Sequence, residues 1–486
     1  MNTLESMQYE MVVGLEIHAQ LSTKSKIYSS DATTFGCEPN TNISVITLAH
    51  PGTMPKLNKK VIEYAIKMGL ACQCDISRYN IFCRKNYFYP DLPKGYQLTQ
   101  DKTPICKGGS VAYTDDEGRE KSVQLNRIHI EEDAGKSLHP EGKPYTMVDL
   151  NRAGVALIEI VTEPDIYNAA DAAKVVSEVR KLVRYLDICD GNMEEGSLRC
   201  DANVSVKPKG STTLGRKVEL KNMNSIKQVR QAIEHEVQRQ LNLIASGNTI
   251  VSETRTFDPV SGSSISMREK EELNDYRYFP EPDLSPVMVT DAWLHEINAT
   301  MPLLPYFLKK RFVDEFGLSD YDAAFLTESR EVANYFLAVC EHTQLYKNAA
   351  NWIMGPVQSA ANDAGLNLEH FPLLPVKLAG IIELIHSGKI TYTMAVQQLM
   401  PALIQKPTEE VEQLAIKLNL VVESNTDSLK ALIEKILADY PEKVKEYRKG
   451  KKGLLGMFMG ELMKQTKGKA DPKVAGNLLK DVLEEK

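Results

Sequence analysis

The sequence predicts an α+β fold in which a cradle-shaped, mostly antiparallel sheet precedes an all-helical region. Residues 9–286 alternate polar and apolar side chains in short segments between Gly, Pro, Asn and Asp, which is typical of strands and turns. From about residue 292 the apolar residues recur with a helical period instead. Between the two regions, residues 280–286 (PEPDLSP) hold three prolines in seven positions, which indicates a boundary.

Helices are expected in both regions. Two of them, at 169–186 and 225–244, interrupt the predicted strands, because their apolar residues form a single stripe at helical spacing. In the second region a helix is predicted at 426–440. The last helix is expected to begin at Asp471 and Pro472, an N-cap residue followed by proline at the first helical position.

The composition limits the class of protein. The chain has 486 residues, of which 43% are hydrophobic and 25% charged, as in an ordinary globular protein of about three domains. Disordered, collagen-like and disulfide-scaffold proteins are therefore excluded. No apolar run approaches the ~20 residues that span a bilayer, and the N-terminus lacks the segments of a signal peptide. We therefore expect a cytoplasmic protein with no membrane partner.

Charge is unevenly distributed along the chain. Residues 441–486 contain 12 Lys and Arg against 7 Asp and Glu, a net charge of +5, whereas the other 440 residues carry a net charge of −12. The densest basic cluster consists of Arg448, Lys449, Lys451 and Lys452. A basic tail on an acidic body can bind a polyanion locally, although a solvated helical face has the same composition.

Five predicted strands place ionisable or amide side chains on one face and apolar side chains on the other. Residues two apart on a strand lie ~6.6 Å apart on the same face, so neighbouring side chains can converge on one ion or phosphate. An ordinary half-solvated sheet explains one such strand but not five. Carboxylates with a histidine favour Mg²⁺, and Arg and Lys favour a phosphate beside it. The polar residues are Glu16 and His18; Arg127, His129 and Glu131; Asp149 and Asn151; Arg199, Asp201 and Asn203; Glu219 and Lys221.

Several other motifs do not carry the chemistry that they suggest. Gly135–Lys136–Ser137 looks like the end of a P-loop, but Ile130 stands where the first glycine would be. Ser263 and Ser264 lack the glycines and the lysine of an amidase nucleophile, and no cysteine turn suggests a glutaminase. The 8 cysteines are irregularly spaced, which favours buried free thiols over a zinc site.

Seven motifs give the chain a family resemblance. They are GLEIH (14–18), RKNYFYPDLPKGYQ (84–97), HIEEDAGK (129–136), DLNR (149–152), EEGSLRCDAN (194–203), ELKN (219–222) and DYRYFPEPD (275–283). They resemble the GatB/GatE family of tRNA-dependent amidotransferase subunits, and the C-terminal part resembles the family's YqeY-like helical domain. We therefore predict a cradle domain at 1–291, a helical domain at 292–407 and a YqeY-like helical tail at 408–486.

The resemblance implies a carbon–nitrogen ligase that uses ATP, Mg²⁺ and glutamine as amido donor. The side-chain carboxylate of Glu or Asp mischarged on tRNA(Gln) or tRNA(Asn) would be phosphorylated, and ammonia from a partner subunit would then displace the phosphate. The expected partners are a GatA-like amidase subunit and a GatC-like small subunit in a heterotrimer. The competing hypothesis is a non-catalytic scaffold that binds tRNA within the same complex.

The resemblance also assigns roles to individual residues. Glu132 and Glu159 can equally be strand-end or loop carboxylates, and the NYFYPDLPKGYQ segment can equally be a structural loop. Where some family members have a CxxC pair, this chain has Ser44 and Thr47, which weakens a zinc site further. The implied catalytic residues are Glu16, His18, Glu131, Arg199, Asp201 and Lys221; the metal ligands Glu16, His18, Glu131, Glu132 and Glu159; the tRNA-binding residues Arg448, Lys449, Lys451 and Lys452.

Overall fold

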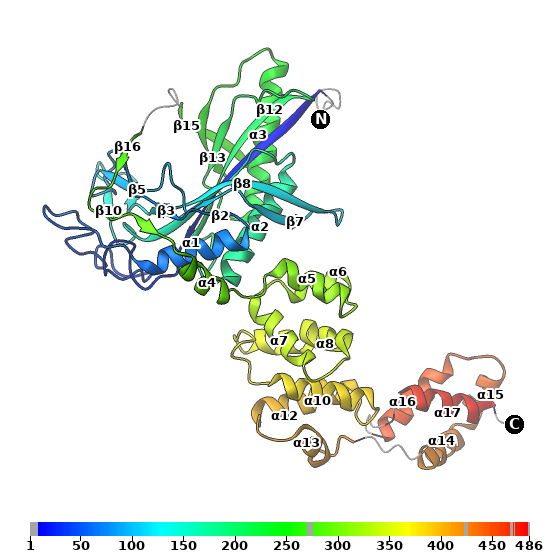
Figure 1. Ribbon diagram of the computed structural model, residues 1–486. Helices are drawn as coiled ribbons and strands as arrows, with labels where there is room; N and C mark the ends of the chain where they lie inside the picture. The colour runs from blue at the N-terminus through cyan, green and yellow to red at the C-terminus, as the bar shows by residue number, and fades with distance from the viewer. Residues whose placement is uncertain (1–7, 270–275, 422–425, 467–469, 471, 485–486) are drawn as a thin grey trace. The chain divides into compact units, whose positions relative to one another are not determined.

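The computed structural model describes residues 8–269, 276–421, 426–466, 470 and 472–484, so the N-cap role predicted for Asp471 lies outside the described residues. The chain divides into two compact units, Met1–Pro305 and Tyr306–Lys486. Strands occur in the first unit, and the described residues of the second are helical or connecting segments (Figure 1). The predicted α+β class, with a sheet region followed by helices, is confirmed.

A large sheet organises the first unit. In the described residues its strands run in the order β15-β14-β13-β12-β1-β11-β8-β5-β4-β16, and β2, β6 and β7 pair alongside this path. Adjacent strands are antiparallel except for the parallel pair β13–β14. The bounds are β1 Tyr9–Gln20, β2 Asp75–Ile76, β4 Cys83–Asn86, β5 Tyr96–Thr99, β6 Cys106–Lys107, β7 Ser110–Thr114, β8 Glu120–Glu132, β11 Ala156–Thr162, β12 Leu198–Pro208, β13 Val218–Lys221, β14 Glu253–Asp258, β15 Ser263–Glu269 and β16 Arg277–Pro280.

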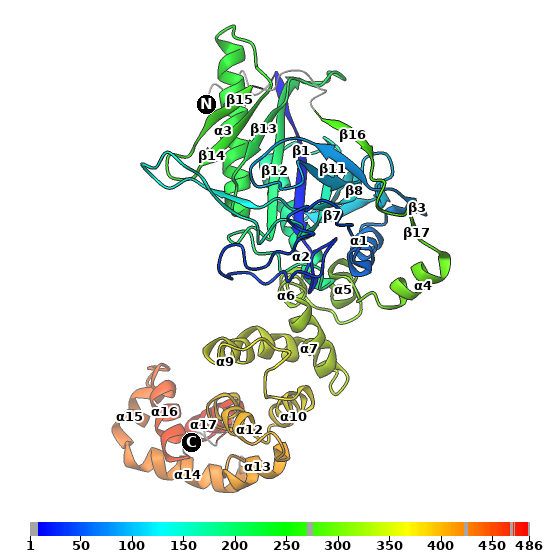
Figure 2. The same cartoon turned by 90° about the vertical axis from the view of Figure 1, so that its left-hand side faces the viewer.

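Three helices pack against the apolar face of this sheet. Helix α1 (Lys59–Ala71) contacts β8, α2 (Ala169–Tyr185) contacts β1 and β7, and α3 (Ile226–Ala245) contacts β12. Their buried apolar residues join those of the central strands in one hydrophobic core. Figure 2 shows β1 in the middle of the sheet, between β12 and β11. Since this face is covered, the polar side chains of the same strands point to the other face.

Helix α1 is a correction to the sequence prediction, which placed only two helices among the strands. The Asn58 side chain caps its first turn by accepting a hydrogen bond from the backbone N of Lys60 at 3.0 Å. Gly69 lies on its buried side, where a Cβ atom would come within 2.3 Å of Cys106 Sγ. The apolar spacing of Val61, Ile62 and Ala65 carried the signal for this helix.

One of the five polar-faced strands is not part of the large sheet, contrary to the prediction. Strand β10 (Met147–Asp149) pairs with β9 (Lys136–Leu138) in a separate two-stranded sheet. Asp149 Oδ1 accepts hydrogen bonds from the backbone N of Asn40 at 3.1 Å and of Asn151 at 3.0 Å. These polar side chains therefore stabilise a loop instead of extending the polar face. A second two-stranded sheet pairs β3 (Tyr79–Asn80) with β17 (Val287–Met288).

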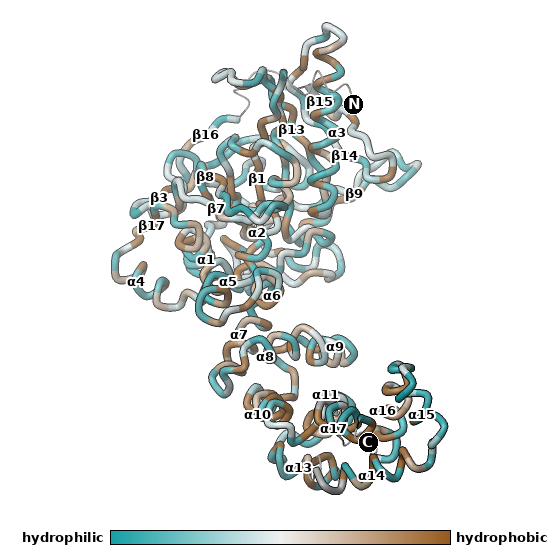
Figure 3. The backbone as a smooth tube through the Cα atoms, turned by 90° about the vertical axis from the view of Figure 1, so that its right-hand side faces the viewer, coloured by the Kyte–Doolittle hydropathy of each residue, from teal (hydrophilic) through white to brown (hydrophobic). Residues whose placement is uncertain are grey.

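The remaining helices follow β17. Helix α4 still belongs to the first unit, and α14 to α17 enclose a hydrophobic core of their own. Figure 3 shows hydrophobic and hydrophilic residues side by side along α13, α14 and α17, as expected of amphipathic helices. The bounds are α4 Asp291–Ala299, α5 Pro305–Asp314, α6 Asp320–Leu326, α7 Arg330–Cys340, α8 Tyr346–Trp352, η1 Ile353–Val357, α9 Gln358–Asp363, α10 Pro375–His386, α11 Tyr392–Met394, η2 Ala395–Leu399, α12 Met400–Gln405, α13 Val411–Lys417, α14 Thr426–Asp439, α15 Pro441–Arg448, α16 Leu454–Gln465 and α17 Pro472–Glu484.

The three-domain division at 291/292 and 407/408 stays a prediction, and the separate core of α14 to α17 is its structural support. Among the described residues, no helix combines the length and the apolar character that crossing a membrane requires.

Candidate functional site

The register of four central strands brings distant polar residues into one row. His129 on β8 lies opposite Glu159 on β11, Glu159 lies opposite His18 on β1, and His18 lies opposite Arg199 on β12. Directly opposite residues of antiparallel strands share a face. Residues separated by up to 181 positions in the sequence, which is the difference between 199 and 18, therefore meet on the open face of the sheet.

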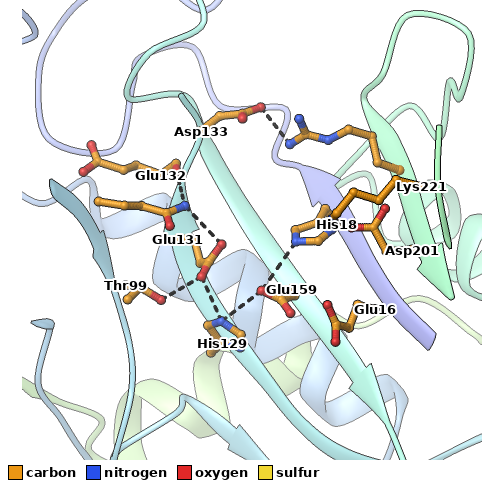
Figure 4. Close-up of polar contacts among 12 residues, drawn as sticks. Glu16, His18, Thr99, His129, Glu131, Glu132, Asp133, Glu159, Asp201 and Lys221 are labelled. Atoms are coloured by element: carbon orange, nitrogen blue, oxygen red, sulfur yellow. Dashed lines mark hydrogen bonds and ion pairs between the residues drawn. The ribbon is translucent and has the colours of Figure 1, made fainter. Parts of the chain in front are cut away.

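A carboxylate–histidine cluster forms around this row (Figure 4). His18 Nε2 lies 3.4 Å from Glu159 Oε2, and His129 Nε2 lies 3.2 Å from the same oxygen. His129 Nε2 also lies 3.1 Å from Glu131 Oε1. His129 and Glu131 are buried, whereas the His18 and Glu159 side chains are 19% and 14% exposed. A ligand can therefore reach the cluster from the side of His18.

Neutral hydrogen-bond donors hold Glu131 in position. Thr99 Oγ1 donates to Glu131 Oε1 at 2.9 Å, and Gln97 Nε2 donates to Glu131 Oε2 at 3.2 Å. Both donors come from β5, in which Thr99 lies opposite Glu131. A carboxylate fixed in this way keeps its orientation when a cation binds beside it.

The electrostatic environment of the cluster favours protonated histidines and ionised glutamates. Burial lowers the pKa of His129, but its hydrogen bonds to Glu131 and Glu159 more than compensate and raise it to about 9. The pKa of His18 is raised in the same way by Glu159. Burial raises the pKa of Glu159, but the two histidines overcome this effect and hold it well below its ordinary value. The carboxylates are therefore ionised at neutral pH, as metal ligands must be, and His18 would have to release its proton before its imidazole could bind a cation.

The donor set fits a divalent metal ion. One ligand atom from each of His18, Glu131 and Glu159 lies within 4.8 Å of the other two. Carboxylate oxygens with an imidazole suit Mg²⁺ or Mn²⁺, which keep waters and substrate phosphate oxygens as further ligands. His129, which is buried, would hold the carboxylates of Glu131 and Glu159 in their orientation through its contacts with both.

A second group of acidic residues lies beside the first. Ligand atoms of Glu16, Asp201 and Glu219 also lie within 4.8 Å of one another. Lys221 forms ion pairs with Asp201 and with Glu219, the latter at 3.2 Å. Burial lowers the pKa of Lys221, but the two carboxylates raise it well above its ordinary value. Lys221 is therefore firmly protonated between two of the three carboxylates, whereas the cluster around Glu159 also offers an imidazole as a ligand, and we take that cluster as the candidate metal site.

The remaining member of this group is a perturbed carboxyl. Asn203 Nδ2 donates a hydrogen bond to Glu16 Oε1 at 2.9 Å. Burial, followed by the charges of Glu159 and Glu219, raises the pKa of Glu16. The Glu16 carboxyl is therefore a weaker acid than an ordinary glutamate.

Arg199 forms an ion pair on the same face. Its Nη2 atom lies 2.9 Å from Asp133 Oδ2, which also accepts a hydrogen bond from Gln20 Nε2 at 2.6 Å. Burial raises the pKa of Asp133, but Arg199 and Arg152 lower it below its ordinary value. The Arg199 side chain is 33% exposed, so part of the guanidinium remains accessible to an anion.

Glu132 is separated from the other residues that the sequence suggested as metal ligands. It follows Glu131 on β8 and therefore points to the other side of the sheet. Its Oε1 atom accepts a hydrogen bond from the backbone N of Leu98 at 2.7 Å and forms an ion pair with Lys94. Glu132 lines a pocket with Lys94 and Tyr28. Glu132 belongs to neither of the two groups of residues whose ligand atoms lie close enough to hold one metal ion.

The four basic residues suggested for tRNA binding lie at the end of α15 and just after it. Arg448 Nε donates to the backbone O of Leu483 at 3.0 Å. Lys451 pairs with Glu446 at 3.2 Å and Lys452 with Glu484 at 3.1 Å, and both lysine side chains are more than half exposed. Lys449 lies beside them at the helix end. Exposed ion pairs of this kind contribute little to stability.

Ser44 and Thr47 contact a carboxylate. The backbone N of Ser44 donates to Asp31 Oδ2 at 2.9 Å, and the Thr47 hydroxyl donates to the same oxygen. Neither residue belongs to a group with metal-binding geometry among the described residues.

Sequence reasoning left three residues of the site without a role. His129 and Glu219 were recognised as polar-face residues, yet their parts in orienting Glu131 and in pairing with Lys221 depend on the strand register. Asp133 was missed although it follows Glu131 by two positions, directly after the end of β8. That spacing was a usable signal.

Known proteins resemble this chain over nearly its whole length. A family model described as GatB/GatE catalytic domain matches residues 11–295, and one described as GatB domain matches residues 334–483. A protein from a Synechococcus species is 48% identical over 97% of both chains. One from Alkalilimnicola ehrlichii is 47% identical over 98% of this chain and 100% of its own. One from Pseudomonas savastanoi is 45% identical over the same shares. All three are named as a subunit of an aspartyl/glutamyl-tRNA(Asn/Gln) amidotransferase.

Proposed function

Because this chain belongs to the GatB/GatE family, we propose that it catalyses the ATP-dependent step of a tRNA-dependent amidotransferase. It phosphorylates the side-chain carboxylate of Glu or Asp mischarged on tRNA(Gln) or tRNA(Asn), and ammonia then converts the product to the amide. The enzyme is a carbon–nitrogen ligase with glutamine as amido donor. The observation that carries this proposal is the convergence of His18, Glu131 and Glu159 on the open face of the sheet.

The chemistry explains why ATP is needed. A carboxylate does not accept ammonia until one of its oxygens becomes part of a leaving group. A side-chain oxygen therefore attacks the γ-phosphorus of ATP, the bond to the β–γ bridging oxygen breaks, and ADP leaves. Ammonia then attacks the acyl carbon, inorganic phosphate departs with the former carboxylate oxygen, and the nitrogen loses a proton. Catalysis of phosphoryl transfer depends on positioning and on compensating negative charge.

The residues of this face suit those two tasks. Magnesium held by His18, Glu131 and Glu159 would compensate negative charge on the phosphoryl group. Arg199 and Lys221 supply fixed positive charge on the same face, since each pairs with a carboxylate there. Asp201 holds Lys221 in place, and Glu16 is a carboxyl with a raised pKa that can exchange a proton.

The ammonia must come from another chain. No amidase or glutaminase nucleophile motif is recognisable in the sequence. We therefore propose a GatA-like amidase subunit and a GatC-like small subunit as partners in a heterotrimer. The proposed compartment is the cytoplasm, where mischarged tRNA would be available.

The non-catalytic scaffold hypothesis is not favoured. A scaffold has no need for two histidines and two carboxylates within hydrogen-bond distance of one another on an accessible sheet face. For tRNA binding we propose Arg448, Lys449, Lys451 and Lys452, whose exposed ammonium and guanidinium groups can exchange their protein partners for phosphates.

The test replaces one carboxylate of the cluster. In the assembled complex, Glu131→Gln should lower tRNA-dependent ATP turnover by about 10²-fold or more, because the substitution keeps the shape of the side chain but removes its charge. The amide retains one acceptor oxygen, so it can accept the hydrogen bond of only one of the two donors, Gln97 and Thr99. ATP turnover and the melting temperature are measured together, and the melting temperature should change little.

The matched control is Glu120→Gln, at the exposed beginning of the same strand. It should retain wild-type turnover. Turnover by Glu131→Gln at the wild-type rate would show that the chemistry takes place elsewhere.

A further inference from the structure

An aromatic and basic patch lies at the edge of the sheet that carries the metal-binding cluster. In the edge strands, Lys85 of β4 lies opposite Tyr278 of β16 on one side and opposite Gln97 of β5 on the other. Gln97 donates a hydrogen bond to Glu131. Since opposite residues share a face, Lys85 and Tyr278 lie on the same face as the cluster.

Three tyrosines gather at this edge. The rings of Tyr87 and Tyr276 meet edge to face, with centroids 5.8 Å apart and an angle of 70° between their planes. Lys85 Nζ lies 4.7 Å from the centroid of the Tyr276 ring. Tyr276 and Tyr278 are 40% and 42% exposed, so ring surface remains accessible. Exposed aromatic rings with a cation beside them are the features on which nucleobases stack.

Two cations share this face with the tyrosines and the cluster, and Lys85 lies on a strand between them. Lys85 is within electrostatic reach of Glu131 and Glu159, whose charges raise its pKa against the effect of burial. Arg127 lies on β8 two positions before His129, and its Nε atom is buried without a hydrogen-bond partner among the described residues. Burial raises the pKa of Tyr278, while the charges of Lys85 and Arg127 both oppose that rise.

The order of these groups matches one ligand. From the edge inward the face offers aromatic rings, then the ammonium of Lys85, then the strand that carries Arg127 and part of the metal-binding cluster. ATP offers a base, then phosphates, then the γ-phosphoryl group. An acylated RNA end places a ribose and an ester between its last base and the reacting carboxylate. Both groups are uncharged, so neither needs a cation beside it.

Building on the proposed function, we propose that Tyr87, Tyr276 and Tyr278 form the stacking subsite for the adenine of ATP. Lys85 and Arg127 receive its phosphates between this subsite and the cluster. The tyrosines are positioning residues for the nucleotide and take no part in phosphoryl transfer.

The test compares two ligands on the full-length chain by calorimetric titration with Mg²⁺ present. One is the non-hydrolysable β,γ-imido analogue of ATP, and the other is inorganic tripolyphosphate, which has no base. Tyr278→Leu should weaken binding of the analogue about tenfold, because stacking is lost, and leave tripolyphosphate binding unchanged. Tyr278→Phe keeps the ring and should bind both ligands like the wild type.

The matched control is Phe279→Leu, which removes the neighbouring exposed ring from the other face of the same strand. It should not change the affinity for the analogue. Unchanged tripolyphosphate binding also shows that the face of the sheet is still folded in each variant. Tyr276→Leu is the second test variant and should behave like Tyr278→Leu.

Three results would overturn the inference, and they are distinguishable. Failure of the wild-type chain to bind the analogue contradicts the proposed function and this inference with it. Wild-type affinity of Tyr278→Leu and Tyr276→Leu for the analogue contradicts this inference alone. If those variants bind the analogue normally but a CCA-ended acceptor RNA more weakly, the tyrosines bind the RNA end instead.

Discussion

Lys26 is the most completely buried lysine in the described part of the chain, with a relative exposure of 1%. It lines the same pocket as Glu132 and Tyr28. Burial lowers its pKa from an ordinary value of 10.5 to about 8, although Asp31, Asp149 and Glu132 act in the opposite direction. A buried lysine of this kind lowers the free energy of unfolding by an amount that depends on pH.

The sign of this dependence follows from proton linkage. Between pH 8 and 10.5 the unfolded chain keeps the Lys26 proton while the folded chain has released it, so the free energy of unfolding rises with pH. Relative to Lys26→Met, the wild type should gain up to about 3 kcal/mol between pH 7.5 and 10.5. Urea unfolding at the two pH values measures this difference.

The control for this prediction is Lys24→Met, since Lys24 is exposed in the same segment. It should show no such change relative to the wild type. A Lys26→Met chain whose stability stays parallel to the wild type at both pH values would mean that Lys26 titrates normally.

Individual residues also show which parts of the site could be predicted from the sequence. Alternation along each strand was sufficient to put Glu16 with His18 and His129 with Glu131 on one face, because side chains of a strand have a fixed period of two. The same period of two places Glu132 on the opposite face from Glu131. The family resemblance nevertheless suggested both residues as metal ligands. The partner of each residue across the sheet depended on the register, which alternation within one strand does not determine.

Among the elements, strands β1, β8, β12 and β13 and helices α2 and α3 could be predicted because each shows a sustained period. Helix α1 was missed although its apolar spacing was visible, since the surrounding segments are rich in turn residues. Strand β10 had the expected alternation but pairs with β9. Alternation predicts that a strand has two different faces, and it does not predict which sheet the strand joins.

The element whose function can be tested most simply is the end of α15 with the residues that follow it. Lys449, Lys451 and Lys452 are expected to contact phosphates. Replacing all three with Gln should weaken tRNA binding at least about tenfold at low salt. Each lost contact lowers the slope of log K against log salt by about 0.7–0.9, so the slope should fall by roughly 2–3. Filter binding over a series of NaCl concentrations measures both quantities.

The control variant replaces Lys389, Lys406 and Lys417, three lysines outside the basic cluster, with Gln. It has the same net charge as the test variant and should keep a salt slope close to that of the wild type. Equal slopes for the two variants would assign tRNA recognition to another part of the chain.

For the whole molecule, the family assignment and the architecture agree. The catalytic-domain model covers the sheet region and the second model covers most of the helical region. Under the proposed function, the acidic body and the basic C-terminal part would have two different tasks, phosphoryl transfer and attraction of a polyanion. The overall charge of the chain, −7, is the sum of two regions of opposite sign.

The central claim is that the carboxylate of the mischarged residue is phosphorylated before it is amidated. It is tested in the assembled complex with mischarged tRNA whose side-chain carboxylate oxygens carry a heavy isotope. After amidation with glutamine and unlabelled ATP, mass spectrometry of the inorganic phosphate measures the transfer. We predict that each phosphate released by amide formation carries one heavy oxygen. Phosphate without the label, formed together with the amide, would contradict the account.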